Sequence, residues 1–351
     1  MKFPLKAMKV SVVILNWNAE HLLRQFLPSV VRNSTLPDGE CEVVVADNGS
    51  TDGSVTLIEE EFPSVRIIRL SENYGFAEGY NRALEQVNAE YAVLLNDDVE
   101  VTAGWLQPLV DFMDSQQSYA ACQPKLLSWR ERDHFEYAGA CGGYLDSFGY
   151  PFCRGRIFDT VEADKGQYDT IADVLWATGA CLMVRMEDYR RVGGLDGRFF
   201  AHMEEIDLCW RLRCRGRAIA CVPESVAYHV GGASLAAGSP RKTFLNFRNN
   251  LLMLYKNLPS NELHRVMLVR GLLDHAAAFA FLLKGEGKNF AAVFRARHAF
   301  RKLRPTFKAS REDNLQAAAS CGNPFMQVPE RYKVFLLLHY HLRRRHTFDQ
   351  L

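Results

Sequence analysis

The sequence predicts an α/β fold with a mainly parallel central sheet and helices on both faces. Apolar, β-branched runs alternate with helical patterns through the first hundred of the 351 residues. The connections between them are short, which is typical of strand–helix–strand units. With 48% hydrophobic and 24% charged residues, the chain is an ordinary globular protein, which excludes wholesale disorder and a collagen-like fibre.

Each element follows from its local pattern. Residues 10–15 form a continuous β-branched run, as expected of a strand covered on both faces. Asn48–Asp52 offers turn and helix-capping residues before the next helix. The other expected strands lie at 42–46, 65–70, 91–95 and 174–185, the helices at 20–32, 53–61, 77–88, 105–115 and 204–215, and a glycine-rich loop at 139–155.

The net charge of +1 hides an asymmetry along the chain. Residues 241–351 contain 20 Lys and Arg against 7 Asp and Glu, whereas residues 1–240 contain 22 against 34. Beyond residue 238 the pattern is mostly helical. We therefore predict a catalytic domain at 9–238 and a basic helical region at 239–351, the second suited to an anionic partner.

The nine cysteines are scattered without a CxxC pair, which disfavours zinc and thioredoxin-like sites and favours a reducing cytosol. The apolar run after the N-terminal lysines is too short for a signal peptide. The most apolar later stretch, residues 271–283, is interrupted by Asp274 and His275. We therefore expect no membrane-spanning helix.

Polar side chains follow the predicted strands. Asn16 comes after the first strand, Asp47 and Asn48 after the second, and Asp97 and Asp98 after the fourth. Ligands of open α/β sheets bind beyond the carboxyl ends of the strands. Adjacent carboxylates repel unless compensated, and a hard divalent cation that also touches a diphosphate would compensate them. A polar turn explains the two acids equally well, and a capped turn is favoured for residues 43–54 taken alone.

A helix start at His202–Asp207 holds three acids. Carboxylates are favourable at a helix N-terminus, but one of them could also act as a base beside a substrate hydroxyl. His202 and His229 are metal-ligand candidates, although a structural histidine is the commoner case. The GxGxxG, GxxxxGK[ST] and GxSxG motifs are absent from the sequence, which disfavours nicotinamide enzymes, P-loop enzymes and serine hydrolases.

Taken in order, these segments resemble family 2 glycosyltransferases with the nucleotide-sugar-binding GT-A fold. Within that family they look most like the bacterial rhamnosyltransferase-like and galactofuranosyltransferase-like branch that builds cell-surface polysaccharides. The resemblance runs from Lys9 to about Ser234. It rests on VSVVILNWN (10–18), VVVADNGSTDGS (43–54), NYGFAEGYNRAL (73–84), LLNDDVEV (94–101), WATGACLMVRMEDYRRVGGLDGRFF (176–200), HMEEIDLCWRLRCRG (202–216) and AYHVGGAS (227–234).

The resemblance implies an inverting transfer of a sugar from a nucleotide-diphosphate sugar to a hydroxyl of a glycan or lipid-linked glycan. Glu205 stands at the position of the catalytic base, where the family has Asp, with Glu204 beside it. Asp207 and Arg211 look like structural partners one turn apart. The residues implied in nucleotide-sugar binding are Asn16, Asp47 (which matches the acid that contacts the base), Asn48, Asn81 and Asp97.

The resemblance also implies a metal ion, Mn2+ or Mg2+, on the diphosphate. Asp98 matches the last acid of the DxD-type motif, and His229 matches a second metal ligand of some relatives. Asn96 stands where the first Asp is usual.

The basic region contains a predicted amphipathic helix. Its basic stripe is Arg297, Arg301, Arg304 and Lys308, and its apolar stripe is Val293, Ala296, Phe300 and Leu303. Such a helix could lie on an anionic membrane, or pack on the acidic first domain or a dimer partner. Lipid-linked acceptors, implied by the resemblance, favour the membrane. The expected location is therefore the cytoplasm, peripherally on the inner face of the cytoplasmic membrane, with no nucleic-acid partner.

Two other functions compete with this interpretation. A nucleotidyltransferase would need a glycine-rich phosphate loop near the N-terminus, which Asn16–Asn18 does not provide. A catalytically inactive nucleotide-sugar-binding or scaffold protein of the same fold is supported by Asn96 and Glu205, where the chain departs from the family pattern.

Overall fold

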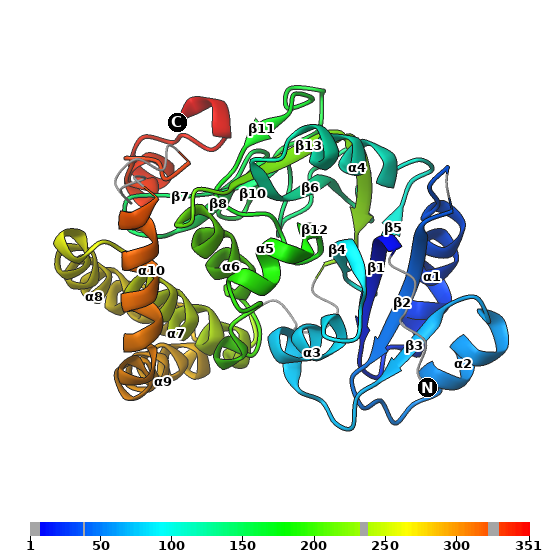
Figure 1. The fold of residues 1–351 in the computed structure, drawn as a ribbon. Coiled ribbons are helices and arrows are strands. Elements are labelled where there is room, and N and C mark those ends of the chain that lie inside the picture. Colours follow the sequence, from blue (N-terminus) through cyan, green and yellow to red (C-terminus); the bar gives the residue numbers. More distant parts are fainter. Residues whose placement is uncertain (1–7, 38, 232–237, 322–329) are drawn as a thin grey trace.

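The computed structural model describes residues 8–37, 39–231, 238–321 and 330–351, so the last three residues of the 227–234 motif lie outside the described residues. Within the described part, the centre is a nine-stranded sheet in the order β11-β13-β6-β12-β4-β1-β2-β3, with β5 paired to β13 (Figure 1). Its strands are β1 (Met8–Asn16), β2 (Cys41–Asp47), β3 (Arg66–Arg69), β4 (Ala89–Leu95), β5 (Val99–Val101), β6 (Tyr119–Ser128), β11 (Ala172–Asp173), β12 (Cys181–Arg185) and β13 (Ala218–His229).

The four strands β4-β1-β2-β3 are parallel throughout, as the strand–helix alternation predicts. Strand β12 is antiparallel to both β4 and β6, whereas β13 is parallel to β6. Because β1, β2 and β4 run in one direction, the polar residues that follow them gather at one edge of the sheet.

Helices cover both faces of the sheet, which confirms the predicted layers (Figure 1). Val12 and Ile14 of β1 belong to a buried cluster with apolar residues of α1 and α4. Val13 points to the other face, into a cluster with residues of α3, α6 and α7. The helices are α1 (Glu20–Asn33), α2 (Ser54–Glu61), α3 (Gly75–Leu84), α4 (Leu106–Ser115), α5 (Met186–Arg191), α6 (Glu204–Arg213), α7 (Pro240–Asn257), α8 (Ser260–Leu283), α9 (Gly287–Leu303) and α10 (Lys308–Ser320). Short helical turns are η1 (Gly197–Phe199), η2 (Arg304–Phe307), η4 (Leu338–Leu342) and η5 (Phe348–Gln350).

The middle of the chain differs from the prediction. The expected loop at 139–155 contains strands of a second, antiparallel sheet, made of β7 (Gly143–Leu145), β8 (Pro151–Cys153), β9 (Arg156–Ile157) and β10 (Thr160–Val161). Gly143 allows this sheet to lie on Trp176, because a Cβ there would be 1.9 Å from the indole ring. The expected strand at 174–185 is wrong over its first half, where a turn precedes β12.

The C-terminal helices pack on the first domain, residues 9–238, and do not form a separate unit. Leu251–Leu254 of α7 belong to the same buried cluster as Val13 and Leu94 of the sheet. The predicted domain boundary at 238–239 therefore stays a prediction, which is based on the change in sequence composition at that point.

The predicted amphipathic helix exists as α9, but its apolar stripe does not face solvent. Val293 and Ala296 are fully buried and Phe300 is nearly so, with α9 packed on α7 and α8. Arg297 of the basic stripe pairs with Asp274 of α8. The interpretation that this apolar stripe meets lipid is therefore wrong. The stripe packs on α7 and α8, two helices of the basic region itself, and not on the partners that the sequence suggested. The helix also ends at Leu303, before Arg304 and Lys308.

Helix α8 is, among the described residues, the one helix long and apolar enough to cross a membrane by length and composition. Its most apolar window has a mean hydropathy of 1.7, and 22% of that window is buried.

Candidate active site

Asn16 and Asp47 lie opposite each other at the carboxyl ends of β1 and β2. The Asn16 Nδ2 donates to Asp47 Oδ1 (3.3 Å) and to Ser50 Oγ (3.1 Å). The Ser50 amide in turn donates to Asp47 Oδ2 (3.2 Å). Asn16 Oδ1 is buried without a hydrogen-bond partner among the described residues. These side chains form a polar floor with an unused acceptor at the sheet edge.

Asn48 lies next to this floor and is almost fully buried. Its Nδ2 donates to Asn73 Oδ1 and to Gly75 O (both 3.1 Å), and its Oδ1 accepts from the Tyr74 amide (3.0 Å). Asn48 therefore holds the turn that begins α3 next to Asp47 and the polar floor.

The acids after β4 meet His229 at the end of β13. His229 Nε2 lies 3.0 Å from Asp98 Oδ1, and His229 Nδ1 lies 3.2 Å from Glu136 Oε1. All three side chains are at most 5% exposed. β13 reaches this edge because it pairs with β5, which directly follows the acids.

The electrostatics of this cluster are strongly coupled. Burial would lower the pKa of His229, but Glu136 and Asp98 outweigh it and raise that pKa to about 10. Burial would raise the pKa of Asp98, but the hydrogen bond and charge of His229 lower it instead. Burial, with a smaller contribution from the charge of Asp98, raises the pKa of Asp97 to about 7.

Asp98 and His229 have the donor chemistry for a divalent ion, because a carboxylate oxygen and an imidazole nitrogen are both common ligands of Mn2+. In this structure Asp98 Oδ1 and His229 Nε2 are hydrogen-bonded to each other at 3.0 Å. Asn96 Nδ2 is 3.4 Å from the same histidine nitrogen, and a flipped amide would direct its oxygen there. Among the described residues no three His, Cys, Asp or Glu side chains converge as a ready-made metal site, so the remaining ligands would come from the diphosphate or from water.

Glu136 is a site residue that the sequence did not indicate. Its Oε2 accepts from the amides of Ala138 (2.7 Å) and Gly139 (3.0 Å), so its second oxygen is held toward His229. Glu136 lies far from every segment of the resemblance that carries an acid, and no motif marks it. Two pairings bring it to His229: β6 pairs with β13, and the segment of Glu136 pairs with β6 through the Leu127–Phe135 bridge.

Glu204 and Glu205 open α6. Burial raises the pKa of Glu205 to about 7, and burial together with the charge of Glu205 raises the pKa of Glu204 well above its usual range. Each has a buried Oε2 without a hydrogen-bond partner among the described residues. Such groups ionise reluctantly and accept a proton readily, as a general base does.

The turn before β12 connects Glu205 to the strand-end acids. A Cβ on Gly179 would lie 3.8 Å from the Glu205 Cβ, and the next residue, Ala180, accepts a hydrogen bond from the Asn96 amide (3.0 Å). One turn thus contacts the base candidate on one side and the metal-ligand segment on the other.

Comparison with known proteins bears on this arrangement. Residues 11–143 match the family described as "Glycosyl transferase family 2". The chain carries a family 2 glycosyltransferase domain. N-acetylglucosaminyl-diphospho-decaprenol L-rhamnosyltransferase of Mycobacterium tuberculosis (strain H37Rv) is 28% identical over 236 residues, which are 62% of this chain and 75% of that protein. Rhamnosyltransferase WbbL of Escherichia coli (strain K12) is 28% identical over 229 residues, 63% of this chain and 83% of that protein.

Solved structures resemble this chain in fold. Mannosyltransferase PcManGT of Pyrobaculum calidifontis, in complex with GDP-Man and Mn2+, has a TM-score of 0.52 at 15% identity and covers 92% of this chain and 90% of its own. S. aureus TarS 1-349 in complex with UDP has a TM-score of 0.51 at 18% identity, and the match covers 91% of this chain and 92% of that chain. These similarities show the GT-A fold that the sequence predicts.

The loop before α6 has a strained backbone. Phe200, His202 and Met203 all have positive φ, between 69° and 73°. Asn249 of α7 holds this loop, because its Nδ2 donates to the carbonyl oxygens of Phe199 (3.0 Å), Ala201 (2.8 Å) and His202 (2.8 Å). The C-terminal helices therefore position the acids that open α6.

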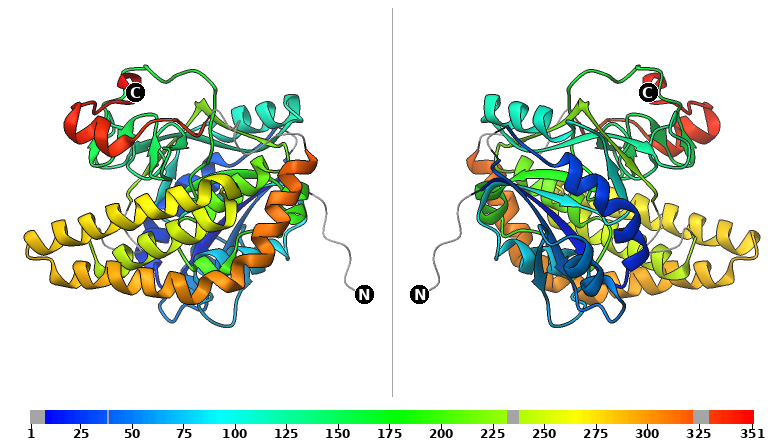
Figure 2. Two further views of the ribbon diagram at one scale, coloured as in Figure 1. Left: turned by 90° about the vertical axis from the view of Figure 1, so that its left-hand side faces the viewer. Right: turned by 90° about the vertical axis from the view of Figure 1, so that its right-hand side faces the viewer.

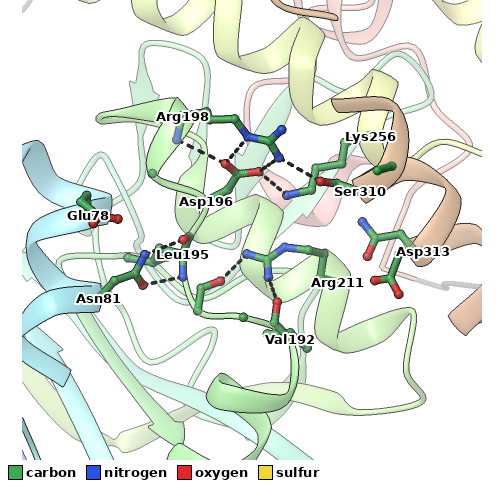
Figure 3. Close-up of a pocket in the computed structure, with 15 residues that line it drawn as sticks. Glu78, Asn81, Val192, Leu195, Asp196, Arg198, Arg211, Lys256, Ser310 and Asp313 are labelled. Atoms are coloured by element: carbon green, nitrogen blue, oxygen red, sulfur yellow. Dashed lines mark hydrogen bonds and ion pairs between the residues drawn. The ribbon is translucent and has the colours of Figure 1, made fainter. Parts of the chain in front are cut away.

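Asn81, a predicted nucleotide-pocket residue, lies on α3 and is hydrogen-bonded to the segment that follows α5. Its Nδ2 donates to Leu195 O (2.7 Å), and its Oδ1 accepts from Tyr189 Oη (2.6 Å) and from the Leu195 amide (3.0 Å). Asn81 thus braces the loop between α5 and α6 (Figure 3). Its part in nucleotide-sugar binding stays a prediction.

The cavity beside Asn81 has a volume of about 560 Å³ and lies between α3, α6, α7 and α10 (Figure 3). Its cations are already paired. Arg211 binds Asp207 (2.8 Å), which confirms the predicted partners, and Lys256 binds Asp207 (2.8 Å) and Asp196 (2.7 Å). Arg198 also binds Asp196. This cavity is a polar junction of the fold, separate from the strand-end site.

Proposed function

We propose that this chain is an inverting glycosyltransferase. It transfers a sugar from a nucleotide-diphosphate sugar to a hydroxyl of a glycan or lipid-linked glycan in bacterial cell-surface polysaccharide synthesis. The observation that carries the proposal is Glu205, whose Oε2 is buried without a hydrogen-bond partner among the described residues and whose pKa is raised, beside a turn that also contacts the segment of the strand-end acids in a GT-A fold. The relatives named as rhamnosyltransferases support a deoxyhexose as the transferred sugar.

The donor would lie along the carboxyl edge of the parallel strands. Asp47, on the floor it shares with Asn16, would accept hydrogen bonds from the base or ribose, with Asn48 holding the adjoining turn. Asp97 and Asp98 would face the diphosphate. Asp98 and His229 would hold Mn2+ or Mg2+, which supplies positive charge for the departing diphosphate.

Glu205 would act on the acceptor. It takes the proton from the acceptor hydroxyl while that oxygen bonds to the anomeric carbon. The bond from this carbon to the diphosphate oxygen breaks, and its electron pair leaves with the nucleoside diphosphate. Because attack and departure occur on opposite faces in one displacement, the anomeric configuration inverts. A base with a pKa near 7 is suited to this proton transfer at neutral pH.

We place this reaction in the cytoplasm, at the inner face of the cytoplasmic membrane, where a lipid-linked acceptor would be reached. The rival is a catalytically inactive nucleotide-sugar-binding protein of the same fold, which Asn96 and Glu205 favour as departures from the family pattern. The unpartnered Oε2 of Glu205 and the raised pKa of this carboxyl favour the enzyme, since a scaffold has no need of a proton acceptor there.

A donor screen distinguishes the two. The protein is incubated with Mn2+ and UDP-, GDP- and dTDP-linked hexoses and deoxyhexoses, and released nucleoside diphosphate is measured beside thermal stability. A ligand that binds the native state raises the melting temperature. We expect one donor both to stabilise the protein and to be hydrolysed slowly. Stabilisation with no release, even with acceptor glycans present, would support the inactive protein, and no stabilisation by any donor would refute both.

A further inference from the structure

Helix α8 presents an apolar face that no other part of the described chain covers. Leu268, Leu272, Ala276, Phe279 and Leu283, here called the α8 apolar stripe, recur every three or four residues and so lie on one side of the helix. Leu268 is 60% exposed, Leu272 70%, Phe279 54% and Leu283 90%. At 1.5 Å per residue the stripe is about 22 Å long. A continuous exposed patch of this kind marks an interaction surface.

The aromatic residues of α9 extend this face sideways. The rings of Phe279 and Phe290 lie 5.8 Å apart, and those of Phe290 and Phe294 lie 4.9 Å apart. Phe294 is itself 38% exposed. The apolar surface therefore spans both helices of the hairpin.

The opposite side of α8 is bound to the protein by buried charges. Asp274 is fully buried and pairs with Arg270 (3.2 Å) and with Arg297 of α9 (2.5 Å). Arg270 also donates to Phe148 O (3.1 Å). A helix that crossed a bilayer would carry these ions into hydrocarbon, at high cost. The length and apolar composition of α8 thus suit a helix that lies flat on a surface, with its charged side against the protein.

The charges around the stripe select the partner. In residues 264–304, all of which the structure describes, every exposed charged side chain is basic: Arg265, Lys284, Lys288, Arg295, Arg301, Lys302 and Arg304. The two acids of this segment are the buried Asp274 and the half-buried Glu286, which accepts a hydrogen bond from Asn289. A second copy of the chain would bring the same positive charge to the face and be repelled. An anionic lipid surface complements both the charge and the apolar stripe.

We propose that the α8–α9 hairpin is the membrane-binding element of this protein. The α8 apolar stripe enters the boundary between headgroups and acyl chains of an anionic bilayer, and the basic side chains contact lipid phosphates. The hairpin extends beyond the rest of the chain (Figure 2), so it can reach a surface first. This surface on α8 and α9 would account for the membrane location given under the proposed function. Its binding to lipid does not depend on the transfer chemistry.

Vesicle sedimentation of the full chain tests this proposal. The vesicles contain phosphatidylcholine with or without one quarter phosphatidylglycerol. We expect binding to the anionic vesicles that weakens with salt, and little binding to phosphatidylcholine alone. Leu272→Glu should lower the partition coefficient about tenfold or more, because one leucine side chain leaves the apolar phase and a negative charge enters. The matched control is Ile171→Glu, which places the same charge at a 46% exposed position outside the hairpin and should leave binding unchanged.

Three results would overturn the proposal: no binding of the unmodified chain to anionic vesicles, equal binding of Leu272→Glu and the unmodified chain, or a stable dimer in sedimentation velocity that Leu272→Glu dissociates. Since both positions are exposed, circular dichroism should show both variants folded. Soluble donor turnover, measured in parallel without vesicles, should be unaffected by Leu272→Glu. Failure of the membrane proposal would therefore leave the glycosyltransferase proposal standing.

Discussion

Replacing Glu205 by Gln separates catalysis from stability in this protein. The amide matches the carboxylate in size but cannot take a proton from an acceptor hydroxyl. Removal of a general base typically lowers the rate by a factor of about 10² to 10⁴. We therefore expect kcat to fall by that factor, while the affinity for the donor, which contacts the other end of the site, stays within about twofold.

The structure also predicts that this variant is at least as stable as the unmodified protein. Burial raises the pKa of Glu205 from 4.5 to about 7, so the folded state binds the proton more tightly than the unfolded state. This contribution to the free energy of unfolding is present below pH 4.5 and is lost as the pH rises through 7. Its size is up to about 3 kcal/mol, at 1.36 kcal/mol per pKa unit. Above pH 7, Glu205→Gln should therefore melt at the same or a higher temperature.

The assay is initial-rate transfer with the donor identified by the screen, from pH 5.5 to 9, beside thermal unfolding at pH 8. The unmodified enzyme should gain activity as the pH rises through about 7, because the base becomes ionised, and the variant should lose that rise. Activity within tenfold of the unmodified enzyme would refute the base role. A melting temperature lowered by several degrees would show instead that Glu205 is structural.

Three further predictions follow from neighbouring residues. Asn249→Ala removes three hydrogen bonds to the strained loop before α6. In steady-state kinetics, kcat should fall at least tenfold while the KM for the donor stays unchanged. A rise in KM as large as the fall in kcat would contradict a loop-positioning role. Glu136→Gln should weaken Mn2+ binding by about 10- to 100-fold in calorimetry, as loss of a carboxylate behind a metal-ligating histidine does; unchanged affinity would contradict its link to His229. Burial lowers the pKa of His202 to about 4. The neutral imidazole therefore contributes to the free energy of unfolding above pH 6.5, and this contribution, up to about 3 kcal/mol, is lost as the pH falls toward 4. His202→Gln should shift the midpoint of acid unfolding to lower pH, and an unshifted midpoint would contradict this.

The sequence predicts local elements well where periodicity is strong. The strands up to residue 95 and their helices agree with the structure within a few residues, since a buried parallel strand reads as an unbroken β-branched run. The second sheet escaped prediction because its strands are two or three residues long, and the first two lie in a glycine-rich segment. Gly143 lies against Trp176, a tertiary contact that no local pattern contains.

The candidate site divides in the same way. The strand-end residues Asn16, Asp47 and Asp98 could be grouped in advance, because parallel strands end at one edge. The hydrogen bonds of Asn81 to Leu195 could not be predicted, because the motif shows which helix Asn81 belongs to but not which segment packs against it. The predicted apolar stripe of α9 exists, but it packs on α7 and not on lipid. Periodicity shows that one side of a helix is apolar, but it does not show what covers that side. Glu136 could not be predicted, because its place beside His229 depends on the pairing of β6 with β13 and of Leu127 with Phe135.

The most direct test of the central claim is calorimetry of donor binding with and without Mn2+, on the unmodified protein and on Asp98→Asn. If Asp98 and His229 hold the ion that binds the diphosphate, donor affinity should rise at least tenfold when Mn2+ is added, and Asp98→Asn should abolish that increase while leaving the metal-free affinity unchanged. Equal donor affinity in the presence and absence of Mn2+, or a Mn2+ effect that survives in Asp98→Asn, would contradict the account.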